Sequence, residues 1–466
     1  MGAYEDFIRG KDMIAASTGI AGAEVDAPWL FPFQRDLVRW SLRRGRAAIF
    51  ADTGLGKTRA QLAWADAVAT HTGGRVLILA PLAVATTGTV PEGERIGIKA
   101  TYARKQPNAE RITVANYEML EHFDPSEFEG VALDESSVLK DFTSSTRTAL
   151  IDAFAATPFR TAYTATPSPN DFTELGNHAE FLGVMRRVEM LAMFFTHDGG
   201  STQDWTIKAH GREAFWRWVC SWAALVKRPS DLGYDDTGYI LPPLDMHQIT
   251  VAATADQARS QGKLFAEAAH GLNEQRAARR STLTDRVALA AAEVAKEPDE
   301  PWVVWCELND ESEALAKAIP GAVEVRGSMT AEQKADALAK FARGEIRVLI
   351  TKASVAGQGL NWQHCARIVY VGVSHSFEQW YQSIRRCWRF GQKRIVKCIV
   401  ITSELEGEVL ANLRRKEADA AKLAEEMRRY TSAIVSENVR GAEREQTAYE
   451  PTVEMVVPAW LRTEAA

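Results

Sequence analysis

Residues 51–58, Ala-Asp-Thr-Gly-Leu-Gly-Lys-Thr, form a glycine-rich segment between an apolar run and a helical pattern. Glycine lets backbone N–H groups turn inward around phosphate oxygens, and the N-terminus of the following helix adds positive potential. In such a loop Lys57 pairs with the β- and γ-phosphates and the Thr58 hydroxyl binds Mg²⁺. The usual pattern starts with Gly, but Ala51 is small enough to keep the loop. The segment therefore predicts a site for a nucleoside triphosphate.

Two carboxylates, Asp134 and Glu135, follow the apolar run Gly130–Leu133. An isolated acid pair is commonly a solvated turn, but this one lies in the same block as the glycine-rich loop. That combination favours an Asp that coordinates Mg²⁺ and a Glu that orients and deprotonates the attacking water. Thr164 and Thr166 end the next apolar run, where short hydroxyls could link the acids to a movement, although Thr-Pro is also an ordinary strand exit.

Gln382, Arg386 and Arg389 have the spacing i, i+4 and i+7, so a helix through this segment would present them on one face. Guanidinium groups are costly to bury unless an anion meets them. A solvated basic face is the alternative. Because the chain also carries a phosphate-binding loop, we interpret the segment as an arginine finger from a second domain, which would raise a hydrolysis rate by about 10³–10⁵.

Short Val/Ile/Leu runs separated by helix-length segments predict the elements that position these residues, since such runs are typical of parallel strands covered on both faces. The expected strands are Ala47–Ala51, Arg75–Ala80, Arg111–Ala115, Gly130–Leu133 and Arg160–Tyr163 in a first block, and Trp302–Cys306, Ala322–Val325, Ile346–Ile350, Arg367–Val371 and Val396–Ile401 in a second. Between the blocks, residues 185–222 are rich in aromatic side chains. We expect a helical subdomain that buries these rings, with an exposed platform for stacked bases as the alternative.

Composition bounds the class of protein. The chain has 466 residues, 46% hydrophobic and 25% charged, and a formal net charge of −6. These values predict a soluble protein of two or three domains, and its acidic balance requires any nucleic-acid contact to come from a local patch. The sequence shows neither a signal-peptide layout nor an apolar run long enough for a membrane span, so we expect a cytoplasmic protein. Five scattered cysteines without a CxxC pair indicate buried, reduced thiols rather than a zinc module or disulfides.

The ordered motif set resembles superfamily 2 helicases, specifically their SNF2-like branch and its versions in bacteriophages and prophages. The resemblance covers residues 28 to 402 and rests on these segments: Phe33-Gln34, Asp52–Thr58, Asp134–Ser137, Thr164–Pro167, Gly357–Asn361 and Gln382–Gln392. It implies an α/β fold with two tandem RecA-like, doubly wound parallel-sheet domains, a helical insertion between them and a helical C-terminal extension. The implied divisions are an N-terminal extension over 1–27, the ATP-binding domain over 28–184, an insertion and connector over 185–300, the second domain over 301–402, and the extension and tail over 403–466.

By this resemblance ATP and Mg²⁺ are the expected ligands. The implied ATP contacts are Gln34, which would read adenine, Thr53, Gly54, Leu55, Gly56, Lys57 and Thr58, with Thr58 and Asp134 holding the metal and Glu135, Gln382, Arg386 and Arg389 acting in catalysis. Coupling would involve Thr164, Thr166, Gly357 and Gly359, and nucleic acid would be touched by Pro81, Leu82, Asn116, Tyr117, Gln358 and Asn361. Two departures from the branch stand out: Ser136-Ser137 replaces Ala-His, and Ser354 stands where many relatives have Arg.

The leading hypothesis from these residues is a monomeric ATPase that moves along double-stranded DNA as its two lobes close and open. A strand-separating DNA or RNA helicase is the alternative within the superfamily. A non-hydrolysing scaffold is disfavoured because Lys57, Glu135 and Arg386 are all intact. The resemblance also suggests phage or host replication and recombination proteins as partners.

Overall fold

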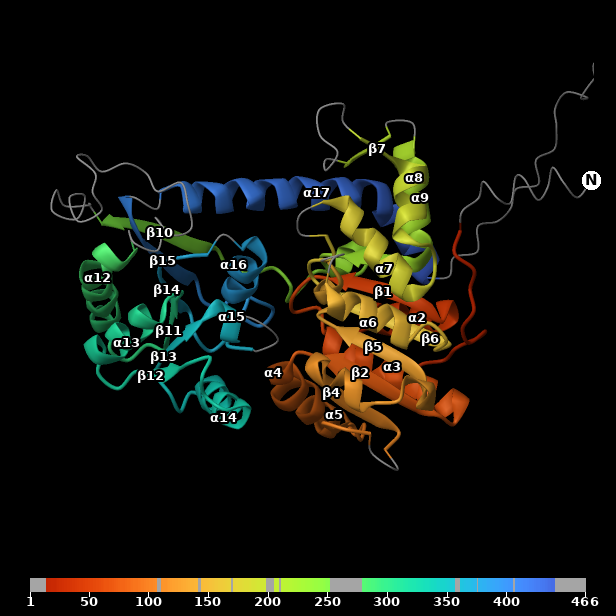
Figure 1. Ribbon diagram of the computed structural model, residues 1–466, viewed down its shortest axis with the longest axis horizontal. Helices are drawn as coiled ribbons and strands as arrows, with labels where there is room; N and C mark the ends of the chain where they lie inside the picture. Colours follow the sequence, from red (N-terminus) through yellow and green to blue (C-terminus); the bar gives the residue numbers. More distant parts are fainter. Residues whose placement is uncertain are drawn as a thin grey trace, which may run out of the picture.

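The computed structural model describes residues 14–106, 110–140, 144–168, 171–197, 205–208, 211–251, 279–356, 361–374, 376–404 and 407–440. Within these ranges the chain forms two lobes that lie side by side, each built around a parallel β-sheet (Figure 1). Neighbouring strands pair in parallel throughout both sheets. The fold is therefore the predicted α/β architecture of two tandem RecA-like domains.

The first lobe contains a seven-stranded sheet. Its strands, in spatial order, are β3 (Thr101–Tyr102), β4 (Ile112–Asn116), β2 (Arg75–Ala80), β5 (Phe128–Asp134), β6 (Phe159–Thr164), β1 (Arg46–Ala51) and β9 (Ala223–Val226). The helices of this lobe are α2 (Pro32–Arg44), α3 (Lys57–Thr72), α4 (Leu82–Val84), α5 (Val90–Ile96), α6 (Ser145–Ala153), α7 (Leu175–Leu182), α8 (Arg187–Phe194) and α9 (Arg212–Trp222). Apolar side chains of the strands pack into separate buried clusters on the two faces, which is why the strands read as unalternated apolar runs.

The second lobe contains a six-stranded sheet. Its order is β10 (Leu244–Val251), β15 (Val396–Ser403), β14 (Arg367–Val371), β11 (Trp302–Cys306), β13 (Val348–Lys352) and β12 (Val323–Val325). Its helices are α12 (Leu283–Lys296), α13 (Asn309–Ala318), α14 (Ala331–Ala342), α15 (Ala353–Ala356) and α16 (Phe377–Ile384). Again one buried cluster covers each face.

Every strand predicted from sequence is present, with ends shifted by at most two residues. The expected domain limits differ from the structure, because strands from the supposed insertion complete both sheets. β9 pairs with β1, so the first lobe extends past residue 184, and β10 pairs with β15, so the second lobe begins before residue 301. β9 is only four residues long, and β10 is an edge strand with several exposed residues, so neither shows the buried-strand pattern.

The aromatic-rich segment is part of the first lobe. The rings of Trp216 and Trp222 are fully buried, and Phe215 and Trp218 pack beside them on one face of the first sheet. The antiparallel pair β7 (Phe195–His197) and β8 (Trp205–Ile207) lies at the end of α8. This burial agrees with the predicted core and leaves these rings no face for stacked bases.

Helix α17 (Gly407–Arg440) runs across both lobes (Figure 1). Val409 and Leu413, near its start, pack in a second-lobe cluster, whereas Val435 and Val439, near its end, pack in a first-lobe cluster. At about 1.5 Å per residue the helix is roughly 50 Å long. It therefore anchors in both cores. The part of the predicted C-terminal tail after residue 440 lies outside the described residues.

All five cysteines are free and buried, as the sequence predicted. Among the described residues no group of His, Cys, Asp and Glu has the arrangement of a metal site. Nor does any helix in those ranges have the length and apolar character needed to cross a membrane.

Candidate active site

The glycine-rich loop connects β1 to α3. Gly54 and Gly56 have φ of +90° and +79°, a left-handed conformation that only glycine adopts without strain. Lys57 begins α3, and its Nζ donates to the carbonyl oxygens of Ala51 at 2.9 Å and Asp52 at 3.3 Å. Thr58 follows in the first turn of α3, and Thr53 lies between Asp52 and Gly54. The loop thus brings its lysine back over its own backbone.

The acid pair ends β5 beside this loop. Gln61 of α3 donates to Asp134 Oδ1 at 2.7 Å, and the Tyr117 hydroxyl donates to the Asp134 backbone carbonyl at 2.6 Å. Burial and then the charge of Glu135 raise the pKa of Asp134 to about 6. Glu135 has φ of +53°, the one positive value at a non-glycine residue of the described chain, and its Oε2 is buried without a hydrogen-bond partner. Strain and an unsatisfied oxygen at one carboxylate are typical of functional sites.

The arginines are not all on a helix. α16 ends at Ile384, so Gln382 is helical, whereas Arg386 and Arg389 lie in the turns that follow. Hydrogen bonds from Arg386 N to Ser383 O (3.3 Å) and from Cys387 N to Ile384 O (3.1 Å) span three residues and tighten the chain. The prediction of one helix through Arg389 is therefore wrong, because these tighter turns replace the α-helical spacing.

The second lobe nevertheless turns its arginines toward the loop lysine. Burial and then Arg389 lower the pKa of Arg386 to about 9, while Glu135 acts in the opposite direction. Burial and then Arg385 lower the pKa of Arg389 to about 10, again opposed by Glu135. Burial lowers the pKa of Lys57 as well, and Arg389 contributes to that shift. Charged groups from both lobes thus share one site, in which Arg386 is buried and Lys57 and Arg389 are half-buried.

The glycine-rich loop and the second lobe also approach each other closely at Gly54. A Cβ atom added to Gly54 would lie 2.8 Å from the Cβ of Phe390, which belongs to the second lobe. Phe390 stacks on Tyr239 at 4.4 Å between ring centroids. Glycine at residue 54 is therefore required by its own backbone conformation and also by its neighbour.

The loop's other expected ATP contact, Gln34, is buried on α2. Its Nε2 donates to the carbonyl oxygen of Leu55 at 2.8 Å, and its Oε1 accepts from Phe31 N at 3.0 Å. The Gln34 amide therefore fixes the glycine-rich loop to α2 through Leu55. Its predicted role toward adenine stays a prediction.

Thr164 is the last residue of β6 and Thr166 follows the strand; both are buried, and Thr166 N donates to Thr164 Oγ1 at 3.1 Å. Strand β6 lies between β1 and β5, and the linking role of the two threonines stays a prediction. Of the other expected coupling and nucleic-acid residues, Gly357, Gln358 and Gly359 lie outside the described residues, and Asn361 is exposed.

Four residues of the first lobe were expected to touch nucleic acid. Pro81 and Leu82 are half-buried at the start of α4. Asn116 is buried and accepts from the Tyr102 hydroxyl at 2.8 Å, and Tyr117 bonds to Asp134 as described. The side chains of Asn116 and Tyr117 thus make hydrogen bonds within the lobe, and their expected contact with nucleic acid stays a prediction. The contacts that Tyr117 and Gln61 make with Asp134 were not predicted from the sequence, because neither residue stands near the acid pair in sequence.

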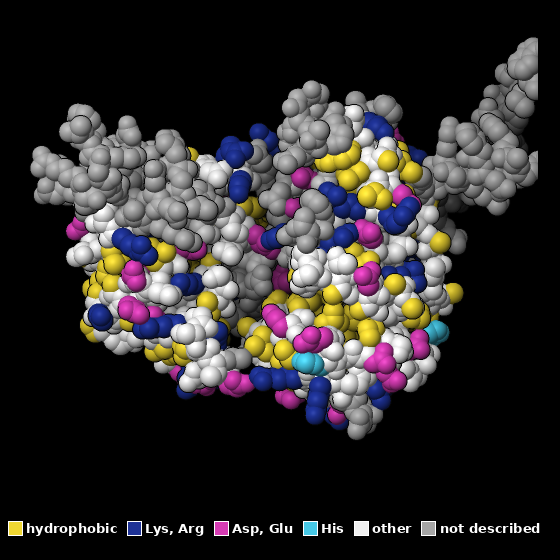
Figure 2. Space-filling view, in the orientation of Figure 1, with side chains coloured by type: hydrophobic (Ala, Val, Ile, Leu, Met, Phe, Trp, Pro, Cys, Tyr) yellow, Lys and Arg dark blue, Asp and Glu magenta, His cyan; other side chains and the backbone are white. Residues whose placement is uncertain are grey.

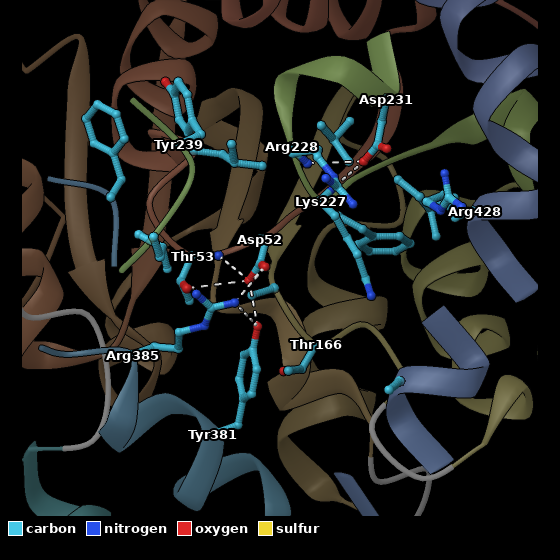
Figure 3. A pocket seen from close by; sticks show the side chains of 18 of the residues that line it. Asp52, Thr53, Thr166, Lys227, Arg228, Asp231, Tyr239, Tyr381, Arg385 and Arg428 are labelled. Atoms are coloured by element: carbon cyan, nitrogen blue, oxygen red, sulfur yellow. Dashed lines mark hydrogen bonds and ion pairs between the residues drawn. The ribbon is translucent and has the colours of Figure 1, made fainter. Parts of the chain in front are cut away.

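A cavity of about 580 Å³ adjoins the glycine-rich loop between the lobes. In Figure 3 Asp52 of the loop is bonded directly to Tyr381 and Arg385 of the second lobe at the wall of this cavity. Thr53 of the loop, Lys227 and Arg228 of the connector and Arg428 of α17 also line it. The cavity therefore lies where the lobes, the connector and α17 meet.

Comparisons with known proteins agree with this architecture. Residues 285–391 match the family described as the helicase conserved C-terminal domain. The pre-mRNA-splicing ATP-dependent RNA helicase PRP28 of Gibberella zeae is 26% identical over 152 residues, which are 31% of this chain and 20% of that protein. The corresponding Neurospora crassa protein is 26% identical over 139 residues, 28% of this chain and 19% of that protein. The chain thus spans about a fifth of the length of these curated relatives.

The matched domain runs from α12 through the turns that carry Arg386 and Arg389. Over these residues the second lobe is therefore similar to the C-terminal domain of helicases.

Proposed function

We propose that this chain is a nucleic-acid motor that hydrolyses ATP between its two lobes. One observation carries the proposal: the segment with Arg386 and Arg389 meets the loop with Lys57, because Arg385 pairs with Asp52 at 3.0 Å and a Cβ added to Gly54 would lie 2.8 Å from Phe390. Lys57, Arg386 and Arg389 are side chains of the types that bind the phosphates of a nucleoside triphosphate, and the glycine-rich loop brings backbone N–H groups beside Lys57. The buried Glu135 Oε2 has no hydrogen-bond partner among the described residues, and it would accept a hydrogen bond from the attacking water.

The roles of the residues follow from this arrangement. Lys57 and Thr58 would hold the phosphates, and Thr58 and Asp134 would hold Mg²⁺. Bound Mg²⁺ would neutralise charge on the phosphate oxygens. Glu135 would orient and deprotonate the attacking water, and Arg386 and Arg389 would stabilise charge on the transferred group.

The site also suggests how hydrolysis moves the lobes. The cations of the two lobes repel one another, whereas bound phosphates between them would attract both. Loss of the terminal phosphate would remove part of this attraction between cations and phosphates, so the lobes would separate. Movement along nucleic acid would follow from repeated closing and opening.

Double-stranded DNA is our leading substrate, because the motif set resembles the SNF2-like branch in its phage form. RNA is the second candidate, because both relatives reported above are named ATP-dependent RNA helicases. Lys and Arg side chains on the face shown in Figure 2 are interspersed with Asp and Glu, in keeping with a local contact rather than a broad basic surface.

A substrate panel tests the proposal. ATP hydrolysis is measured with blunt duplex DNA, single-stranded DNA, duplex RNA and single-stranded RNA of matched length, with Lys57→Ala as the inactive control. We expect duplex DNA to stimulate most, with an effect that falls steeply as salt rises because backbone contacts release counterions. Stimulation by RNA alone would contradict the DNA assignment and favour the RNA helicase. Strand displacement from a tailed duplex separates unwinding from translocation.

A further inference from the structure

Helix α16 is tied to the first lobe at its N-terminal end. Glu378 is buried and forms an ion pair with Lys140 across the interface. Lys140 directly follows the short 3₁₀ helix η4 (Ser136–Leu139), which itself begins directly after Glu135. The Lys140 backbone carbonyl accepts a hydrogen bond from Asn177 Nδ2 at 2.9 Å. The chain segment that carries Glu135 therefore reaches the second lobe through Lys140.

The C-terminal end of α16 is tied to the glycine-rich loop itself. Asp52 Oδ1 accepts a hydrogen bond from the Tyr381 hydroxyl at 2.7 Å, and Asp52 Oδ2 pairs with Arg385 Nη2 at 3.0 Å (Figure 3). The Arg385 guanidinium also lies 5.2 Å from the Tyr381 ring centroid and 4.7 Å from that of Trp388. We refer to Asp52, Tyr381 and Arg385 as the inter-lobe clasp.

The clasp is shielded from solvent. The side chains of Asp52 and Arg385 are 18% and 14% exposed. A charge-assisted pair held between aromatic rings keeps a defined geometry, whereas an exposed pair is screened and mobile. The contact is therefore rigid enough to set the position of neighbouring atoms.

The residues next to the clasp are the proposed arginine finger, Arg386 and Arg389. Glu378, Tyr381 and Arg385 share one face of the segment at i, i+3 and i+7, and Arg386 is the next residue. On the other side of the interface, Asp52 and Lys57 belong to one loop. Catalytic groups must be held within about 0.5 Å of their working positions by the residues around them.

We propose that the inter-lobe clasp positions Arg386 and Arg389 against the phosphate site, with Lys140 and Glu378 fixing the other end of α16. The inference rests on the proposed ATPase function and deepens it. Asp52 and Arg385 are positioning residues, since they act through the finger. Their loss should lower kcat for ATP and leave KM nearly unchanged, because Lys57 and the loop glycines remain.

A double-mutant cycle tests this coupling. Asp52→Ala and Arg385→Ala are each expected to lower kcat by about 10- to 100-fold, which corresponds to about 1.4–2.7 kcal/mol at 1.36 per decade. KM for ATP should stay within about threefold. The double variant should lose no more than the worse single variant, because the two side chains act as one unit.

A matched control separates positioning from general stability. Glu297→Ala breaks the Arg367–Glu297 pair, which has a distance of 2.6 Å and side chains 21% and 26% exposed but lies within the second lobe. We expect kcat of this variant to stay within about twofold of the parent. Thermal unfolding of all variants checks that each is folded.

Lobe distance gives a readout that does not depend on turnover. Dyes on cysteines introduced at Glu121 and Lys317, both exposed, report energy transfer between the lobes, and the buried native cysteines resist labelling. With a non-hydrolysable ATP analogue, Asp52→Ala should shift transfer toward separated lobes. Unchanged transfer together with unchanged kcat, or multiplied losses in the double variant, would overturn the clasp. A parent protein without any ATPase activity would overturn the proposed function, while the transfer measurement still decides on the clasp.

Discussion

Replacing Arg386 by methionine should make the nucleotide-free protein more stable and yet inactive. Burial, reinforced by Arg389, lowers the pKa of Arg386 from its ordinary value to about 9. At about 1.36 kcal/mol per pKa unit, the closed site without phosphate disfavours the charged guanidinium by roughly 5 kcal/mol. Opening of the lobes lets the guanidinium reach water, so the measured gain should be smaller than this. Methionine removes the charge and keeps much of the side-chain volume.

Two assays measure the opposite effects. In ATP hydrolysis, Arg386→Met should lower kcat by about 10³–10⁵. In thermal denaturation without nucleotide, its midpoint should rise by about 2–4 °C for each kcal/mol recovered. Arg394→Met is the control, because Arg394 belongs to the same lobe but its side chain is 42% exposed. Turnover within tenfold of the parent, or a lower midpoint than the parent, would refute the assignment of Arg386 to a buried phosphate site.

Four further outcomes are expected. Lys57→Ala should abolish both phosphate release and the rise in thermal midpoint on adding ATP. Glu135→Gln should keep ATP binding in a filter assay but lower turnover by about 10²–10⁴, because it removes the general base. Burial lowers the pKa of His178 to about 4, so between pH 4 and 6.5 the folded protein binds fewer protons than the unfolded protein and its stability rises with pH. His178→Gln should therefore lessen the stability lost in urea unfolding between pH 6.5 and 4.5 by about 2–3 kcal/mol, and an equal loss in both proteins would argue against a buried neutral histidine. Gly54→Ala should lower turnover at least tenfold, since the new Cβ would lie 2.8 Å from Phe390 and φ is +90°, and normal turnover would show that the lobes do not close there.

Local patterns were sufficient for the fully buried strands of both sheets and for the glycine-rich loop. Strands such as Trp302–Cys306 are buried along their whole length, so their sequence is a continuous apolar run that can be recognised locally. The loop likewise carries its own evidence, since Gly54, Gly56 and Lys57 must be close in sequence to surround one phosphate chain. Chemistry contained in one short segment can be predicted from that segment.

Contacts between distant segments could not be predicted in the same way. β9 has only four residues within an aromatic-rich segment, and its place beside β1 depends on tertiary packing. Helical periodicity also misplaced Arg386 on a helix, because α16 ends at Ile384 and the chain continues in tighter turns, although Arg386 is still buried. The clasp partner Arg385 stood in the same segment, but nothing in its spacing pointed to Asp52, which lies more than 300 residues away.

The residues after Glu135 show why such long-range contacts matter for coupling. Ser136 Oγ is hydrogen-bonded to His178 Nε2 of α7 at 3.1 Å, so this hydroxyl is bonded within the first lobe. Lys140 is the residue of the segment that crosses to Glu378. Only the short helix η4 lies between Glu135 and Lys140. Its first residue, Ser136, is bonded to His178, and the Lys140 carbonyl that follows it is bonded to Asn177. If Glu135 acts in hydrolysis as proposed, we expect its shift to reach α16 through Lys140 and Glu378, on the same helix that carries Tyr381 of the clasp.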